Sequence, residues 1–180
     1  MNTLAPASAL TTLNADAKLL IQGQWLNSQS QKFTRIVNPA TQEVLGRTPE
    51  ATLSEVHTAI ASAHSAFATW RKTPLGTRVR VMLKYQALVR QHMSRIARII
   101  TQEQGKTWAD AEGDVFRGLE VIEHACSIAS LQMGEFSENV GNEVDTYTLR
   151  QPIGVCVGIT PFNFPAMIPL WMFPMAIVCG

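Results

Sequence analysis

The chain has 180 residues, enough for one ordinary domain with a hydrophobic core, because domains cluster near about 100 to 150 residues. Its 15 basic and 14 acidic side chains give a net charge of +1, which excludes the basic surface that nucleic acid or an anionic membrane requires. Three scattered cysteines fit neither a disulfide framework nor a zinc site, so a reducing compartment and no metal are expected.

The N-terminal half is predicted to begin with a tail and a set of short strands. Residues 1–18 lack the basic region and long apolar tract of a secretory signal, so we expect a flexible N-terminal tail. Between Leu19 and Thr48, short apolar runs alternate with turn residues such as Gly23 and Asn38. This pattern predicts short strands joined by turns.

Three helices are predicted next. Thr52 and Glu55 form a T-x-x-E capping box, and apolar residues then recur at spacings of three and four as far as Trp70. A second amphipathic helix follows from about Thr77, with apolar residues such as Leu83 and Leu88 expected to face a core and the interleaved basic residues expected on its solvated side. The third opens after the sequence EQGKT, where Thr107 is the candidate N-cap.

The third helix carries an arginine whose surroundings are predicted from the helical wheel. Arg117 lies opposite the main apolar sector, close beside Val121 and Ile128. Because these two neighbours are apolar, this second side of the helix is expected to be covered as well. Arg117 is therefore predicted to lie against protein rather than in bulk water.

The C-terminal part is predicted to contain two strands, a turn and a helix. A strand is expected at TYTLR, ending before Pro152, and residues 153–159, IGVCVGI, have the continuous apolar character of a parallel strand buried on both faces. The chain then turns at TPFNFP, residues 160–165, and begins a helix. No residue after Arg150 is charged, but prolines recur every four or five residues. Because each interior proline costs a helix roughly 3 kcal/mol, a membrane span is not expected.

A buried parallel strand followed by a turn and a helix is the opening of a βαβ unit. Such a unit must return to a neighbouring parallel strand, and the 180 residues do not include that return. We therefore expect them to be the N-terminal piece of a longer α/β protein.

Asn163 is the candidate functional residue of the turn. Ligands of open α/β sheets bind beyond the carboxyl ends of the strands, which is where TPFNFP lies. A fixed side-chain amide is a suitable donor to the oxyanion that develops when a carbonyl is attacked. From the spacing alone, the simpler interpretation is that Asn163 closes the turn.

The sequence GITPFNFP, preceded by NPAT and EQGK, resembles the aldehyde dehydrogenase superfamily, and the resemblance extends over residues 20–180. Within this superfamily, the stretches NPATQEVLG and DVFRGLEVIEHAC and the sequence from YTLRQPIG onward resemble the CoA-acylating methylmalonate-semialdehyde dehydrogenases. The implied fold is an incomplete Rossmann-type NAD-binding domain with N-terminal helices and part of a β-hairpin oligomerisation arm. No G-x-G-x-x-G motif follows residues 153–159, which suits the different NAD-binding mode of this superfamily.

The resemblance also implies a division of the chain. Residues 19–143 are expected to form the N-terminal part of the NAD-binding domain, and residues 144–152 a strand of the oligomerisation arm. Residues 153–180 are expected to supply the first strand, turn and helix of the dinucleotide-binding sheet, with the catalytic domain outside the chain.

The activity implied by the resemblance is the oxidation of methylmalonate or malonate semialdehyde with NAD and coenzyme A. The products are propanoyl-CoA or acetyl-CoA, carbon dioxide and NADH, in valine and thymine catabolism. A homotetramer is implied for the full-length enzyme, located in the cytoplasm, or in the mitochondrial matrix of a eukaryote. Neither nucleic acid nor a membrane is an expected partner.

The resemblance assigns roles to individual residues. Asn163 matches the asparagine that donates to the oxyanion, and Arg117 matches an arginine that recognises the substrate carboxylate, for which its guanidinium fork is suited. Four residues are implied to line the cofactor: Ile159, Thr160, Pro161 and Phe162.

The cysteine nucleophile of the family is not matched by any cysteine of this chain. Cys126 is expected on a packed side of a helix, Cys156 in a buried strand and Cys179 in a helix, so all three are interpreted as structural. The chain alone is accordingly expected to be inactive. Two alternatives stay open: a semialdehyde dehydrogenase of the hydrolytic type, and a non-catalytic short chain that only associates with full-length subunits.

Overall fold

The computed structural model describes residues 16–180, which divide into two compact units, residues 16–60 and residues 61–180. Helix α1 (Leu53–Trp70) contributes its first turns to the first unit and the remainder to the second. Most of the predicted tail, residues 1–15, lies outside the described residues. Residues 16–18 are not free, because the N–H of Ala17 donates to the carbonyl of Arg47 at 2.7 Å.

The first unit contains two antiparallel hairpins. Their strands are β1 (Leu19–Ile21) with β2 (Gln24–Leu26), and β3 (Phe33–Val37) with β4 (Val44–Pro49). The β1–β2 turn consists of Gln22 and Gly23, whose φ angles are +57° and +73°, as a tight two-residue turn requires. The short strands and turns predicted for this region are confirmed.

A network around Glu55 sets the start of helix α1. The Thr52 hydroxyl accepts the N–H of Glu55 at 3.3 Å, and the Thr52 N–H donates to the Glu55 carboxylate at 2.7 Å. This confirms the predicted capping box. The same carboxylate accepts the N–H of Gln29 at 2.7 Å and the hydroxyl of Ser28 at 3.0 Å. These donors, first the N–H of Gln29 and then that of Thr52, lower the pKa of Glu55 to about 2.

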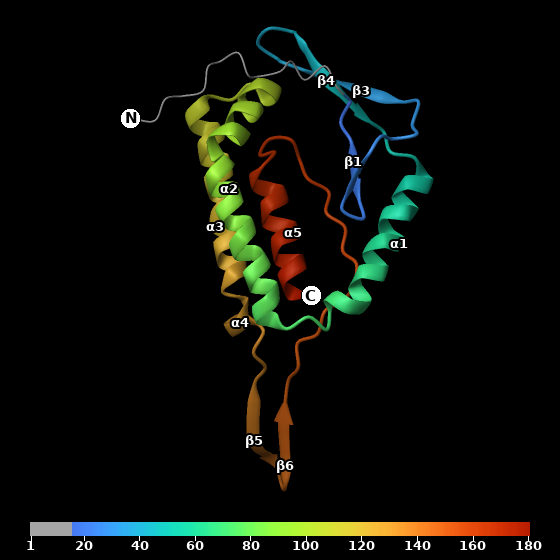
Figure 1. Ribbon diagram of the computed structural model, residues 1–180. Helices are drawn as coiled ribbons and strands as arrows, with labels where there is room; N and C mark the ends of the chain where they lie inside the picture. Colours follow the sequence, from blue (N-terminus) through green and yellow to red (C-terminus); the bar gives the residue numbers. More distant parts are fainter. Residues whose placement is uncertain (1–15) are drawn as a thin grey trace. The chain divides into compact units, whose positions relative to one another are not determined.

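The second unit is built on three long helices. They are α2 (Leu75–Gln104), α3 (Trp108–Cys126) and α5 (Met167–Cys179), and a single turn, α4 (Ile128–Leu131), follows α3. Figure 1 shows α5 beside α2 and α3, with its axis along theirs. The core between these helices is apolar, and its fully buried members include Ala97, Ala111, Val115, Leu119, Ile122 and Val178. The three helices expected from the periodicity are confirmed as α1, α2 and α3.

The packed faces of the helices differ from the predicted ones. No residue of α1 is buried, and Leu83 and Leu88 of α2 are 50% and 52% exposed. Arg78, at the start of α2, is instead buried, with no hydrogen-bond partner for its Nε or Nη1 within residues 16–180. Apolar residues cover more than one sector of α2, and the spacing alone does not indicate which sector packs against the neighbouring helices.

Helix α5 packs unusually close to α3. A Cβ atom added at Gly118 would lie only 2.5 Å from Cδ1 and 2.9 Å from Cβ of Leu170, so the contact needs a glycine. Helix α5 has 13 residues and contains Pro174.

None of the helices in the described part of the chain is both long enough and apolar enough to cross a membrane.

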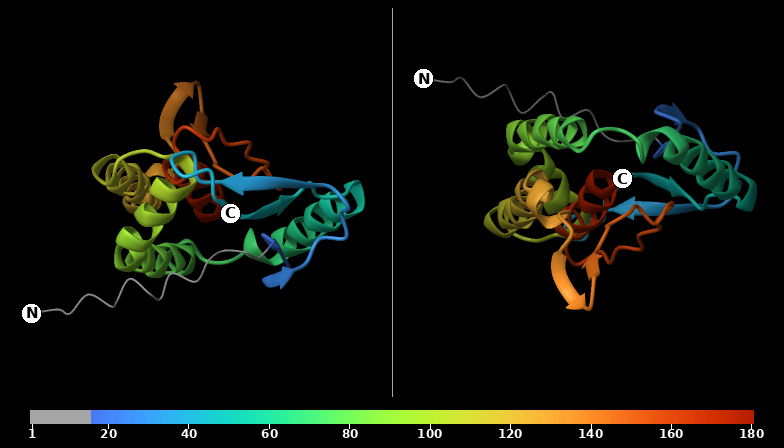
Figure 2. Two further views of the ribbon diagram at one scale, coloured as in Figure 1. Left: turned by 90° about the horizontal axis from the view of Figure 1, so that it is seen from above. Right: turned by 90° about the horizontal axis from the view of Figure 1, so that it is seen from below.

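A hairpin connects the helices to the C-terminal segment. It consists of β5 (Phe136–Gly141) and β6 (Val144–Tyr147), and every residue of both strands is exposed. Figures 1 and 2 show it projecting away from α2, α3 and α5. The predicted strand at 144–152 therefore ends earlier, at Tyr147. Strand β5 was missed because its polar, fully exposed sequence lacks the alternation that marks a half-buried strand.

The strand predicted at residues 153–159 is not formed. The segment from 151 to 161 has no strand assignment, and Ile153, Val157 and Ile159 are 92%, 78% and 89% exposed. The prediction of burial on both faces was therefore wrong for this structure. A strand needs a partner to satisfy its backbone groups, and no strand within residues 16–180 pairs with this segment.

Candidate active site at the turn before helix α5

The TPFNFP segment turns the chain into helix α5. Residues 162–166 bend and turn, and α5 begins at Met167. Asn163 is exposed, and its side chain has no hydrogen-bond partner among residues 16–180, so its amide is available to a ligand. The interpretation that Asn163 closes the turn through its side chain has no support in this geometry.

A buried carboxylate from α3 receives the end of the turn. Asp114 is only 1% exposed, and its Oδ1 accepts the N–H of Met167 at 2.7 Å. It thereby satisfies one of the free N–H groups at the start of α5 and places a negative charge at the positive end of the helix dipole.

A lysine from the α2–α3 connection binds both this carboxylate and the turn. Nζ of Lys106 lies 3.0 Å from Oδ2 of Asp114 and donates to the backbone carbonyl of Asn163 at 2.9 Å. It also lies 4.5 Å from the ring centroid of Phe164, a cation–π contact. Asn163 is therefore attached through its backbone while its side chain stays free.

Sequence reasoning missed both members of this ion pair. Asp114 lies on the apolar sector of α3, between Ala111 and Gly118, which are both buried. A lone carboxylate on a buried helix face needs a partner, so the position of Asp114 in the sequence could have indicated a buried ion pair or hydrogen bond. No signal pointed to Lys106 as the partner, because their contact depends on how the chain turns between α2 and α3.

The residues expected to line a cofactor are accessible. Ile159 and Phe162 are 89% and 58% exposed, and Thr160 and Pro161 are exposed as well. Their backbone groups make no hydrogen bonds among residues 16–180. The segment thus offers free peptide groups and an apolar surface to a ligand.

The start of α5 is not suited to a pyrophosphate. In the common dinucleotide-binding fold, the N-terminus of the first helix holds this group. Here Asp114 already accepts the N–H of Met167, so this donor is not free for a phosphate. This agrees with the absence of a G-x-G-x-x-G motif after residues 153–159, and a cofactor position beside residues 159–162 stays a prediction.

Arg117 is exposed, which corrects the prediction that it lies against protein. Its backbone carbonyl accepts Nε1 of Trp171 on α5 at 3.4 Å, so its main chain faces α5 while its guanidinium is free. No ion pair or hydrogen bond within the described residues joins the Arg117 side chain to Asn163. The structure does not bring these two predicted site residues into contact.

The three cysteines lie in different environments. Cys156 is exposed, which corrects its predicted place in a buried strand, and its thiol donates to the Gly154 carbonyl at 3.6 Å. Cys126 and Cys179 are half-buried at the ends of α3 and α5. Burial, with a further contribution from the charge of Glu123, raises the pKa of the Cys126 thiol. Within residues 16–180, none of the three thiols makes a hydrogen bond to a histidine or carboxylate side chain of the kind that activates a nucleophilic cysteine.

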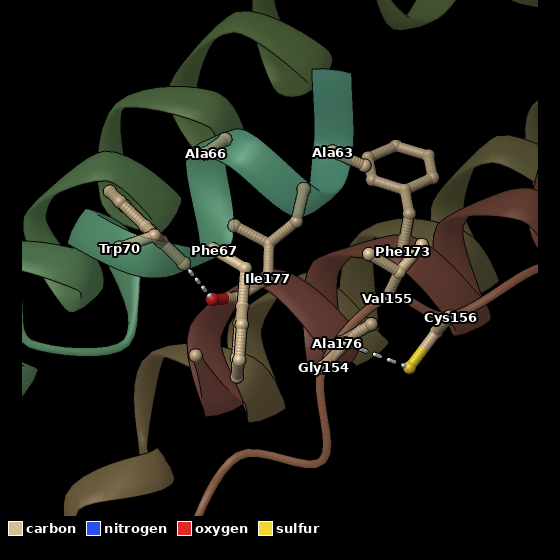
Figure 3. A pocket seen from close by; sticks show the side chains of 11 residues that line it. Ala63, Ala66, Phe67, Trp70, Gly154, Val155, Cys156, Phe173, Ala176 and Ile177 are labelled. Carbon is tan, nitrogen blue, oxygen red and sulfur yellow. Dashed lines mark hydrogen bonds between the residues drawn. The ribbon is translucent and has the colours of Figure 1, made fainter. Parts of the chain in front are cut away.

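An apolar groove lies beside Cys156 (Figure 3). Phe67, Trp70, Phe173 and Ile177 line it, and the indole N–H of Trp70 donates to the carbonyl of Ile177 at 2.7 Å. No charged side chain lines the groove, so it lacks an acid–base pair for catalysis. Within residues 16–180, no cluster of histidine, cysteine and carboxylate side chains could hold a metal ion.

The class of protein follows from these features together with the comparison of the sequence with known families. Residues 25–180 match the aldehyde dehydrogenase family, and the chain belongs to this family. The match includes the turn with Asn163, the lysine and carboxylate that hold it, and Arg117.

Within this family, the chain is most usefully compared with two curated relatives of the same kind. The chain is 58% identical to the mitochondrial, acylating methylmalonate-semialdehyde dehydrogenase of Arabidopsis thaliana, over 89% of this chain and 26% of the relative. It is 55% identical to the acylating methylmalonate-semialdehyde/malonate-semialdehyde dehydrogenase of Homo sapiens, also mitochondrial, over 97% of this chain and 32% of the relative. The chain thus spans about a third or less of these curated relatives.

The fold agrees with solved structures. Methylmalonate-semialdehyde dehydrogenase from Oceanimonas doudoroffii superimposes with a TM-score of 0.87 and 46% identity, over 92% of this chain and 34% of that one. A protein from Sinorhizobium meliloti 1021, solved in complex with NAD, also gives a TM-score of 0.87, with 42% identity over the same shares. The chain therefore has the fold of the matching part of an aldehyde dehydrogenase.

Proposed function

We propose that these residues form the N-terminal part of an NAD-dependent, CoA-acylating methylmalonate-semialdehyde dehydrogenase, here called the full-length enzyme. The observation that carries the proposal is the identity of 58% and 55% to two relatives of this kind, over nearly all of the chain. The free amide of Asn163, on a turn held by a buried ion pair, supports it.

The proposed reaction joins an oxidation to the formation of a thioester. Methylmalonate semialdehyde, CoA and NAD give propanoyl-CoA, carbon dioxide and NADH, and malonate semialdehyde gives acetyl-CoA in the same way. NAD, when bound, supplies the hydride acceptor. The reaction belongs to valine and thymine catabolism, in the cytoplasm or, in a eukaryote, in the mitochondrial matrix.

Asn163 acts when a thiolate adds to the aldehyde carbon. The electron pair of the C=O bond moves to oxygen, and the Asn163 amide donates a hydrogen bond to this oxyanion. Because the carbonyl of Asn163 is held by Lys106, the amide needs little reorganisation at that moment. Removing one such donor typically lowers kcat by about 100- to 1,000-fold.

Further residues hold the substrate and the cofactor. The guanidinium of Arg117 recognises the carboxylate of the semialdehyde through paired hydrogen bonds. Residues 159–162 lie along the cofactor and shield it from water on one side. Support comes from the exposure of Arg117 and of this segment.

The nucleophile is assigned to the part of the full-length enzyme outside these residues. Among the described residues, Cys126, Cys156 and Cys179 make no hydrogen bond to a histidine or carboxylate side chain, and the Cys126 thiol has a raised pKa. The resemblance also implies that a lysine and a glutamate that hold the adenosine ribose of NAD lie in that part. The chain alone is accordingly expected to form no NADH.

The hairpin β5–β6 is proposed as part of an oligomerisation arm, and the full-length enzyme as a homotetramer. Exposed apolar residues on both strands support this role, because they would be buried by a second subunit.

The function is tested by following NADH formation from methylmalonate semialdehyde in the presence and absence of CoA. Acyl-CoA formation and a rate that depends on CoA are expected from the full-length enzyme. A free acid formed at a rate independent of CoA would favour the hydrolytic alternative. A natural short chain that purifies with full-length subunits without restoring activity would favour the non-catalytic alternative.

A further inference from the structure

We propose that Lys106 and Asp114 are positioning residues that fix the backbone of Asn163 and thereby aim its side-chain amide. The inference rests on the proposed role of Asn163 as the oxyanion donor. Its structural part, the attachment of the turn to the ion pair, can be tested independently of that role.

The ion pair holds the turn at two points. Nζ of Lys106 donates to the carbonyl of Asn163 at 2.9 Å, and Oδ1 of Asp114 accepts the N–H of Met167 at 2.7 Å. These points are four residues apart, and the contact between Nζ and Oδ2 of Asp114, 3.0 Å long, links them. The short segment from Asn163 to Met167 is therefore clamped at both ends.

Most hydrogen-bonding groups of Lys106 and Asp114 are used in the contacts that hold the turn. An ammonium group has three N–H donors, and two of them are taken by Asp114 and Asn163. The centroid of the Phe164 ring also lies 4.5 Å from Nζ. The side chains of Lys106 and Asp114 are only 12% and 0% exposed, so water does not replace these contacts.

A role limited to stability does not account well for such a pair. Taking two charges out of water costs several kcal/mol, and buried pairs often give no net stability relative to apolar residues of similar size. The pair does, however, specify one backbone position for Asn163. A misplacement of about 1 Å at a catalytic group can lower the rate about 100-fold. A fixed backbone at Asn163 would therefore protect the rate of the reaction.

The catalytic test is a double-mutant cycle in the full-length enzyme with Lys106→Met and Asn163→Ala. The rate of NADH formation in a single turnover is expected to fall about 100-fold or more for Asn163→Ala and about tenfold for Lys106→Met. If Lys106 acts through Asn163, the double variant loses about as much as Asn163→Ala alone. Losses that multiply would overturn the proposal.

Two controls accompany the cycle. Lys106→Arg keeps a cation and several donors and should recover part of the rate lost in Lys106→Met. Lys84→Met removes an exposed lysine of α2 and should leave the rate unchanged. If Lys106→Arg gave no more activity than Lys106→Met, the cation would not be what positions Asn163.

A second measurement does not depend on activity. Amide hydrogen exchange in a peptide covering residues 160–168 is expected to be at least about tenfold faster in Lys106→Met than in the wild type, with Lys84→Met unchanged. Unaltered exchange would overturn the proposal even if the enzyme were active. Faster exchange in a protein without dehydrogenase activity would leave the positioning intact and refute the proposed function instead.

Discussion

Arg117 projects from α3 one helical turn after Asp114, the residue that receives the start of α5. Its main-chain carbonyl is bound by Trp171 of α5, while its guanidinium is exposed. A charge-assisted pair with a carboxylate is worth roughly 1.5–3 kcal/mol, which corresponds to about 10- to 150-fold in binding. The proposed role of Arg117 therefore has a measurable size.

Arg117→Ala is expected to lower kcat/KM for methylmalonate semialdehyde by about 10- to 100-fold, because the substrate carboxylate loses its partner. Propanal has no carboxylate, so its kcat/KM should change by less than about twofold, within the usual range for an exposed position. Steady-state kinetics with the two aldehydes measure the difference. Equal losses for both would assign Arg117 a structural role.

Glu55 gives a prediction about pH. Its folded-state pKa of about 2 lies below the ordinary value of 4.5, so folding favours the charged carboxylate. The resulting stability is fully present above about pH 4.5 and is lost as the pH falls toward 2.

The comparison that isolates this effect is wild type against Glu55→Gln, by chemical unfolding across the acid range. The stability difference should be constant above about pH 4.5 and should shrink toward pH 2, because glutamine does not titrate. A difference that does not vary with pH would show that the charge of Glu55 does not stabilise the capping network.

The sequence predicted some properties of the site residues and not others. The turn with Asn163 could be located from the sequence, but the role of its amide as a donor rested on the resemblance of GITPFNFP to the aldehyde dehydrogenases, because the spacing alone favoured an asparagine that closes the turn. The exposure of Arg117 was mispredicted, because a helical wheel shows which residues share a side but not which side another element covers.

At the scale of the elements, the packing of α3 against α5 depends on Gly118. Gly118→Ala is expected to destabilise the full-length enzyme by about 1–3 kcal/mol, since the new methyl group would overlap Leu170. Gly113 on the same helix has no atom within 4 Å of an added Cβ, so Gly113→Ala should stabilise by about 0.5–1 kcal/mol. Chemical denaturation of both variants measures the contrast, and equal effects would contradict the close contact.

The β5–β6 hairpin carries the prediction about assembly. Phe136 and Tyr147 are cross-strand partners, 65% and 70% exposed. Changing both to serine should weaken subunit association by at least about tenfold, because each side chain would lose about 1.5–3 kcal/mol of burial. The next cross-strand pair, Ser137 and Thr146, is the matched control. Analytical ultracentrifugation measures association in the variant with Phe136→Ser and Tyr147→Ser and in the control with Ser137→Ala and Thr146→Ala. An unchanged oligomer in the first variant would refute the role of the hairpin as an oligomerisation arm.

The elements were predictable to different degrees for physical reasons. Helices α1 and α3 have side-chain N-caps, and α1, α2 and α3 all have an apolar period, both of which are local features. Strand β5 has neither, and residues 153–159 would form a strand only beside a partner. A sequence rich in β-branched residues thus favours a strand, but the strand forms only where a neighbouring strand pairs with it.

At the scale of the whole molecule, the family was predictable because its motifs occur in a fixed order along the chain. The Lys106–Asp114 clamp was not, because it joins residues from the α2–α3 connection, α3 and the turn. The sequence motif EQGK contributed to the resemblance, whereas the function of its lysine required the three-dimensional structure.

The most direct test of the account follows the two carbonyl carbons of methylmalonate semialdehyde through a reaction of the full-length enzyme with NAD and CoA. A label in the carboxyl carbon should be released as carbon dioxide, and a label in the aldehyde carbon should be recovered in propanoyl-CoA, with one NADH formed for each. Recovery of both labels in methylmalonate, with CoA unconsumed, would contradict the acylating reaction proposed here.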